Sequence, residues 1–231
     1  MQPYFIWNGT DSRNMDVIVT SYPPIIRPPE RAIQQTIPGR AGTLIITEGD
    51  DVYDSYIRTF VIGLKPGMNA HLIENWLRGS GVAVFGNESN FRYFGRILSA
   101  VQFDKVGAWR LKSAAVQMLC QPFKGRNPAE SNITVSSSGY IDGFGDVKAK
   151  PVITVNGSGN MTFQFGSSFF TLISAPTGLK IDSDAGIILT SGGAAWTGSW
   201  VGEFPQLLPS RTYVTIPSGV SLTITPNWRF L

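Results

Sequence analysis

Short runs of β-forming residues, each ended by Gly, Pro or Asn, follow one another along nearly all of this 231-residue chain. In residues 132–231 such runs recur roughly every ten residues, as in sandwich folds. The clearest runs are Pro151–Val155, Met161–Phe165, Phe169–Ile173, Leu179–Asp182, Ile187–Thr190, Tyr213–Ile216 and Ser221–Pro226. The 25 Gly and 15 Pro residues supply the turns. The pattern predicts a mainly β fold.

One segment of the first half has helical rather than β periodicity. Asn69–Arg78 begins with a residue type that commonly caps helix N-termini, and Gly79 follows it. The predicted apolar face consists of Leu72, Ile73, Trp76 and Leu77. We expect one short helix among strands.

Residues 121–131 interrupt both periodicities with two Pro, one Gly and several polar residues. Beyond them Lys and Arg become rare, and Gly, Ser and Thr dominate. We therefore predict two β-sandwich domains, residues 1–125 with the helix and residues 126–231 without one.

Charged residues make up only 15% of the chain, against roughly 25% in an average soluble domain. The net charge of +3 is spread out, so no basic stripe predicts nucleic-acid recognition. A weakly charged surface favours contact with other proteins.

Few residues suggest catalysis. Cys120 and His71 are the only Cys and His, they lie far apart in the sequence, and no Gly-x-Ser-x-Gly or phosphate-binding loop is present. We expect Cys120 to be a buried strand residue, and we predict neither an enzyme nor a cofactor. A pair of glycosidase carboxylates is spatial and stays open, so a cell-wall hydrolase ranks last among the functions considered.

Two acidic segments could be read as metal sites. Glu48-Gly49-Asp50-Asp51 with Asp54 offers carboxylates to a hard cation, but it also suits a solvated hairpin tip before a strand at Tyr53–Leu64. Asp182–Gly186 resembles part of a calcium loop and lacks its distal Glu. We favour turns in both places and predict no metal.

The N-terminal residues have no basic segment and no long apolar run, and no stretch approaches 18 apolar residues. We expect a protein that folds in a cytoplasm and has no membrane partner.

Trp196 and Trp200 flank Thr197-Gly198-Ser199. These two rings either stack on a sugar or belong to a strand edge or core, and the second interpretation is favoured.

Three motifs near the N-terminus have a characteristic order and spacing. They are Phe5-x-Trp7-Asn8-Gly9-x-Asp11-Ser12, Pro28-Pro29-Glu30-Arg31 and Pro38-Gly39-Arg40-x-Gly42-x-Leu44. Together with the helix and the expected strands Val82–Phe85 and Ala108–Cys120, they resemble the N-terminal domain of the distal tail proteins (Dit) of siphophages.

The resemblance to this family is less specific in the second half of the chain. The motifs that resemble the family's second domain are Ile181-Asp182-Ser183, Phe204-Pro205-x-Leu207 and Ile224-x-Pro226-x-Trp228-Arg229. Where relatives often have Pro-Gly-x-Asn, this chain has Pro209-Ser210-Arg211-Thr212.

The resemblance implies a galectin-like C-terminal domain and a structural, non-enzymatic role at the virion tail tip, after assembly in the host cytoplasm. Six copies would form a ring through the N-terminal domain. The ring would join the major tail (tube) protein to the tail-associated tip protein. Its outer domains would carry receptor-binding or baseplate proteins in some relatives.

We infer that Arg31–Leu44 contributes to a ring or tube contact, since apolar side chains there flank a turn that has no catalytic neighbours. The predicted contact residues are Arg31, Ile33, Ile37, Arg40 and Leu44. Trp7–Ser12 and Pro28–Arg31 are further predicted assembly elements. The alternative function is a carbohydrate-binding module of a host-adhesion device, with Trp196 and Trp200 as sugar contacts.

Overall fold

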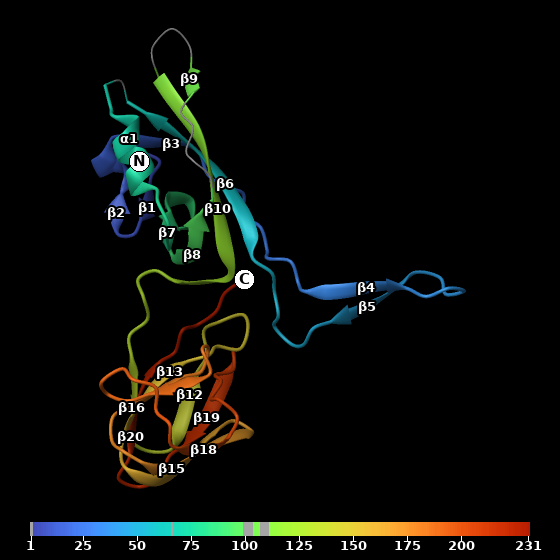
Figure 1. Ribbon diagram of the computed structural model, residues 1–231, viewed down its shortest axis with the longest axis vertical. Helices are drawn as coiled ribbons and strands as arrows, with labels where there is room; N and C mark the ends of the chain where they lie inside the picture. The colour runs from blue at the N-terminus through green and yellow to red at the C-terminus, as the bar shows by residue number, and fades with distance from the viewer. Residues whose placement is uncertain (1, 66, 99–103, 107–110) are drawn as a thin grey trace. The chain divides into compact units, whose positions relative to one another are not determined.

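The computed structural model describes residues 2–65, 67–98, 104–106 and 111–231. The chain divides into two compact units, Met1–Pro128 with Leu231 (unit 1) and Ala129–Phe230 (unit 2), and each is described by itself (Figure 1). Both units are built mainly of β-strands, and one short α-helix lies in unit 1. The predicted fold class is confirmed.

Unit 1 is built on a sheet with the strand order β2-β1-β7-β8-β10-β6-β3, and β9 pairs with β10. Its strands are β1 (Phe5–Trp7), β2 (Thr10–Asp11), β3 (Val17–Ser21), β6 (Tyr56–Leu64), β7 (Ser80–Phe85), β8 (Phe91–Ile97), β9 (Asp104–Val106) and β10 (Leu111–Arg126). One face of this sheet packs on the helix around a core that includes Phe5, Phe60 and Ile73.

Strand β10 is longer than predicted at its C-terminal end, and the expected start at Ala108 lies outside the described residues. The pairing of β10 with β8 shifts register between Cys120 and Lys124 and then continues to Arg126. A bulge of this kind accommodates Pro122, which has no N–H to give to a ladder. The first half of the predicted linker is therefore strand.

The helix α1 (Ala70–Trp76) is one of the predicted elements. Asn69 caps it as expected, since its Oδ1 accepts a hydrogen bond of 3.0 Å from the backbone N–H of His71. Ile73 is fully buried, whereas Leu72 is 54% exposed, so the predicted apolar face is wrong at Leu72.

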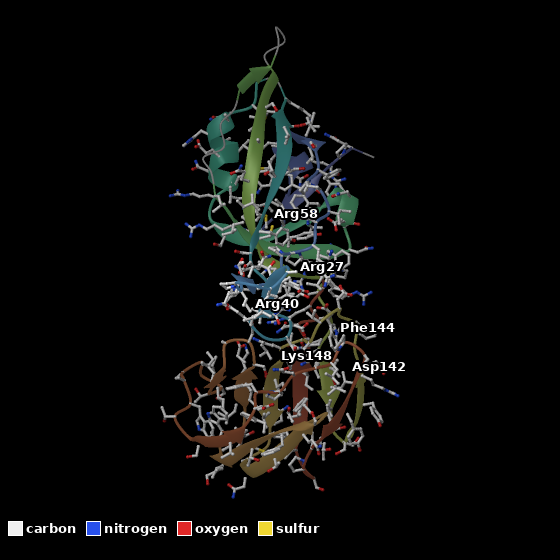
Figure 2. All side chains as sticks on the ribbon, turned by 90° about the vertical axis from the view of Figure 1, so that its right-hand side faces the viewer. Arg27, Arg40, Arg58, Asp142, Phe144 and Lys148 are labelled. Carbon is white, nitrogen blue, oxygen red and sulfur yellow. The ribbon has the colours of Figure 1, made fainter. Side chains whose placement is uncertain are left out.

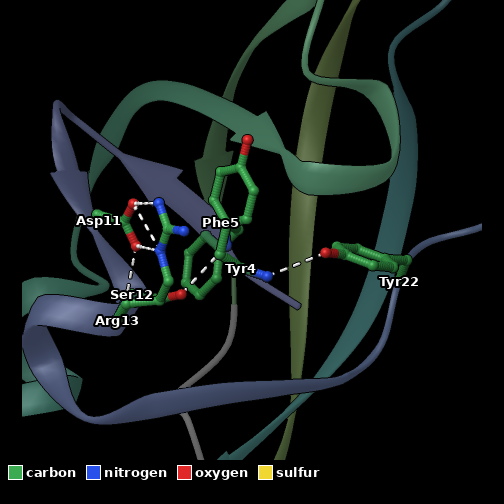
Figure 3. A network of polar contacts seen from close by, with 6 residues as sticks. All are labelled: Tyr4, Phe5, Asp11, Ser12, Arg13 and Tyr22. Carbon is green, nitrogen blue, oxygen red and sulfur yellow. Dashed lines mark hydrogen bonds and ion pairs between the residues drawn. The ribbon is translucent and has the colours of Figure 1, made fainter. Parts of the chain in front are cut away.

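The opening motif stabilises unit 1 from inside. Asn8 and Gly9 both have positive φ and close the two-residue turn between β1 and β2. The buried Ser12 hydroxyl accepts a hydrogen bond of 3.1 Å from the Phe5 N–H (Figure 3). Trp7 is 1% exposed. The interpretation of Trp7–Ser12 as an assembly element is wrong for Trp7 and Ser12, because both are buried.

Asp11 and Arg13 complete this motif at the surface of unit 1. Asp11 caps the 3₁₀ helix η1 (Ser12–Met15) and binds the Arg13 guanidinium at 2.5–3.1 Å (Figure 3). The guanidinium lies over the ring of Tyr4, whose backbone N–H donates to the Tyr22 hydroxyl at 2.9 Å.

Unit 2 is a sandwich of two antiparallel sheets, with the strand orders β11-β20-β13-β16-β17 and β12-β19-β14-β15-β18. The first sheet contains β11 (Ile133–Val135), β13 (Val152–Asn156), β16 (Leu179–Asp182), β17 (Ile187–Leu189) and β20 (Ser221–Thr225). The second contains β12 (Gly139–Asp142), β14 (Gly159–Phe165), β15 (Ser168–Ala175), β18 (Ser199–Gly202) and β19 (Arg211–Thr215). Alternating residues of both sheets share one core, which is the physical basis of the evenly spaced runs in the sequence.

Candidate assembly interface

Two strands of unit 1 lie outside its large sheet. β4 (Ala32–Thr36) and β5 (Thr43–Thr47) pair only with each other, between β3 and β6 in the sequence (Figure 1). Nine of their ten residues are exposed and the tenth, Leu44, is half-buried. We name residues 29–54 the arm, residues 37–42 its tip, and residues 29–31 with 48–54 its root.

One face of the arm is apolar. The register pairs Ile33 with Ile46 and Gln35 with Leu44, and these four side chains lie on one side because β alternation has a period of two. The same alternation brings Ile37 to this side. Ile33, Ile46 and Ile37 are 54%, 46% and 37% exposed. Ile33, Ile37, Leu44 and Ile46 are called the apolar face below.

The tip is the predicted hairpin turn. The Arg40 N–H donates to the Ile37 carbonyl at 3.1 Å, with Pro38 at the first corner and Gly39 at φ +81°. This is a type II turn, in which the second corner requires positive φ. The Arg40 side chain is exposed at the end of the arm.

The two chain segments of the root are held together. The Arg31 N–H donates to Val52 O at 3.0 Å, and the Asp54 N–H donates to Pro29 O at 2.9 Å. The Arg31 Nε also donates to the Asp54 carboxylate at 2.8 Å, and its Nη1 lies 3.8 Å from Glu48. Arg31, a predicted contact residue, therefore orders the root.

A buried arginine links the chain before the arm to the sheet. Arg58, labelled in Figure 2, lies on β6 and is 1% exposed. Its Nη2 donates to Pro24 O at 3.2 Å and to the Glu88 carboxylate at 2.8 Å. The guanidinium lies over the rings of Tyr93 and Phe85, at 4.1 and 5.3 Å from their centroids. The burial of Arg58 was not predicted, although Arg58 has the same strand parity as the buried Phe60.

Glu88 remains charged in this site. Burial alone would raise the pKa of its carboxyl, but hydrogen bonds from Arg58 and Tyr93 and the charges of Arg58 and Lys124 outweigh that effect and leave the pKa below its usual value. The Lys124 Nζ lies 3.8 Å from the carboxylate. The cluster is thus an ion pair that holds strand β6, the 3₁₀ helix η2 (Gly86–Glu88) and the segment leading to the arm.

The acidic segment 48–54 belongs to the root of the arm. It was expected at a hairpin tip, but β5 does not pair with β6, so that interpretation is wrong. No group of three or more His, Cys, Asp or Glu side chains within the described ranges is arranged to hold a metal ion.

The remaining chemically notable residues lie apart. His71 is exposed on α1, and Cys120 is fully buried in β10, where burial raises the pKa of its thiol to about 12. A search of the described helices found none that is long and apolar enough to cross a membrane.

The two tryptophans of unit 2 occupy different surroundings. Trp196 is half-buried and its side chain packs against the core, and its backbone N–H donates to Ile188 O at 2.8 Å. Trp200 is 40% exposed on the edge strand β18, where its ring stacks on Phe170 at 5.3 Å and contacts Phe204 at 4.8 Å. Each ring is therefore engaged by neighbouring side chains.

Unit 2 also has a groove of about 370 Å³ between its edge strands β11 and β12. Tyr140, Asp142 and Phe144 line it, and neither predicted sugar-binding tryptophan does. Asp142 and Phe144 are labelled in Figure 2.

Comparisons with known proteins identify the fold. No protein-family model matches the chain, and no curated protein matches it either. The crystal structure of the SPP1 Dit (gp 19.1) protein, described as a paradigm of the hub adsorption apparatus in phages that infect Gram-positive bacteria, has a TM-score of 0.69 and 17% identity over 100% of both chains. A chain of the phage P2 baseplate in its activated conformation with Ca has a TM-score of 0.46 and 9% identity over 97% of both chains, and at that score it adds nothing to the assignment. The resemblance predicted from the N-terminal motifs is confirmed at the level of the fold, since this chain has the fold of the SPP1 Dit protein over its entire length.

Proposed function

We propose that this protein is a structural subunit of a siphophage tail hub, in which six copies form a ring that joins the tail tube to the tail tip. Two findings support the proposal. The fold matches a phage hub protein over the whole chain, and the arm has an apolar face that nothing in its own hairpin covers.

The uncovered apolar face is the observation that carries the proposal. Three isoleucines at 37–54% exposure on one side of a hairpin lose contact with water only when a further surface covers them, and a neighbouring copy would supply that surface. Burying the exposed half of each of the four side chains is worth roughly 1 kcal/mol per residue, or a few kcal/mol per arm. A ring needs two different adhesive surfaces per subunit, and the arm supplies one of them.

The partners follow from this role. The major tail protein and the tail-associated tip protein would contact opposite sides of the ring, and unit 2 would carry receptor-binding or baseplate proteins. The protein would be located at the virion tail tip, after assembly in the host cytoplasm. Chemistry is not required of any residue, so the role is non-enzymatic.

The experiment is a mass measurement over a concentration series, by light scattering after size exclusion, together with negative-stain images. A hexamer has six times 25.2 kDa, about 151 kDa, and appears as a ring with a central pore. The variant Ile33→Asp with Ile46→Asp is expected to remain monomeric.

The matched control is Ile45→Asp. Ile45 lies next to Ile46 on β5 and is 61% exposed, but its side chain points to the opposite side of the hairpin. The Ile45→Asp variant is therefore expected to assemble normally. Rings that form equally well from the Ile33/Ile46 variant would refute the assembly role of the apolar face.

Carbohydrate binding is the second candidate, and only the 40% exposure of Trp200 favours it. Titration of the ¹⁵N-labelled protein with monosaccharides, followed by NMR, tests it directly. Saturable shifts around β18 that disappear in Trp200→Ala would support sugar binding, and a flat titration would exclude it for the sugars used.

A further inference from the structure

We propose that the arms of neighbouring copies meet tip to root, so that Arg40 of one copy pairs with the acidic segment Glu48–Asp51 of the next. In the same contact Ile37 and Leu44, at the end of the apolar face next to the tip, pack on Ile33 and Ile46, at the end next to the root. This inference rests on the proposed ring and specifies which surface of the neighbour receives the arm.

The tip carries one charge in uncharged surroundings. Arg40 is the only charged residue between positions 32 and 47, and its side chain is exposed beside Ile37. A lone cation at the end of an apolar surface specifies a partner surface that is apolar with a carboxylate at its border.

The root has that composition. Its five carboxylates, at positions 30, 48, 50, 51 and 54, outnumber its single cation Arg31, which pairs with Asp54 and lies 3.8 Å from Glu48. Thr47 alone separates Glu48 from Ile46, whose side chain pairs with Ile33 on the apolar face. Apolar side chains and negative charge are therefore adjacent at the root.

Arg40 cannot reach the acidic segment of its own chain. Seven residues, including the five of β5, lie between it and Glu48, and the eight chain steps span about 25 Å when extended. The distance is far beyond the reach of an arginine side chain, so in the proposed contact the carboxylates come from a second copy.

Tip and root are two different surfaces, so the contact is head to tail and can close a ring. Two strands about 10 Å wide that overlap over about 17 Å cover far less than the roughly 800 Å² per partner of a standard interface. A single contact is therefore weak, and closure of the ring makes the contacts cooperative.

Charge reversal tests the inference. Arg40→Glu places like charges in contact, and so does Asp50→Lys with Asp51→Lys. Each variant alone is expected to raise the concentration at half-assembly at least about tenfold. In an equimolar mixture Glu at position 40 meets the new lysines and Arg40 meets the native carboxylates, so alternating hexamers should form near the wild-type concentration.

The control reverses an exposed charge elsewhere. Lys180→Glu on β16 of unit 2 should assemble like the wild type. Circular dichroism confirms that each surface variant is folded.

The outcomes separate the two proposals. If wild-type rings form and Arg40→Glu assembles equally well, or if the mixture stays unassembled, the tip-to-root contact is wrong and the ring stands. Restored dimers in place of hexamers would also overturn it, because they indicate antiparallel pairing of two arms. If the wild-type protein forms no ring at any concentration, the proposed function fails and this inference fails with it.

Discussion

Removing the negative charge of Glu88 should destabilise unit 1 strongly. Arg58 and Glu88 have side chains that are 1% and 7% exposed, and they meet at 2.8 Å. Glu88→Gln leaves a buried cation without its counter-charge, a change that typically costs 3–5 kcal/mol. The Pro24 carbonyl and the Tyr93 ring still face the guanidinium, so we expect the lower end, about 3 kcal/mol. For a unit of this size the melting temperature should fall by about 10 °C.

The assay is urea unfolding followed by NMR of buried amides in β6 and β10, which reports on unit 1 alone. The matched control is Asp16→Asn, which removes an exposed ion pair to Lys65 at a position with φ +51°, where Asn is well tolerated. It should cost less than about 1 kcal/mol. Arg58→Met with Glu88→Leu removes both charges and should recover most of the loss.

The stability that Glu88 gives to unit 1 should decrease at acidic pH. The pKa of Glu88 is lower in the folded protein than in the unfolded chain, so its contribution is complete above about pH 4.5 and is lost as the pH falls through the folded-state pKa. Glu88→Gln should lack this component. A Glu88→Gln variant within about 1 kcal/mol of the wild type, or one that keeps the full acid sensitivity, would refute the reasoning.

Three further outcomes are expected. Ser12→Ala leaves the buried Phe5 N–H without its acceptor and should cost about 1–3 kcal/mol in urea unfolding. Gly198→Ala places a Cβ in steric overlap with the Trp196 ring and should displace that ring, which near-ultraviolet circular dichroism detects. The Cys120 thiol, buried with a pKa raised to about 12, should react with a thiol reagent at pH 8 only after unfolding; rapid reaction of the folded protein would contradict its burial.

The strands could be predicted because their signals are local. The Asn8-Gly9 and Pro38-Gly39 turns and the alternation of Met161, Phe163 and Phe165 each lie within a few residues, and the structure places turns and buried side chains there. Turn chemistry and alternation together largely determine where strands begin and which face they bury.

Other features depend on contacts between distant residues. The burial of Arg58 requires Glu88, which lies thirty positions away in the chain. No local pattern around either residue indicates that the two form an ion pair. That β5 pairs with β4 and not with β6 depends on the whole sheet, because both pairings suit the local pattern.

The candidate interface was partly predictable. Ile33, Ile37, Arg40 and Leu44 were identified from the apolar residues flanking a turn, and they lie together on the arm. Ile46 was missed, because its side of the hairpin depends on the register of β4 and β5. Arg31 lies in the root, held by carboxylates for which the sequence indicated only a turn or a cation site.

The arm has a consequence for the protein before assembly. Both of its strands have a free edge, and the sixteen residues from 32 to 47 include five isoleucine or leucine side chains and a single charge. Such a segment is a template for fibrous aggregation in a freshly synthesised chain. Arg40, with Pro38 beside it, then acts as a gatekeeper that interrupts strand stacking. Neutralising Arg40 would endanger the soluble pool of subunits before any ring could form.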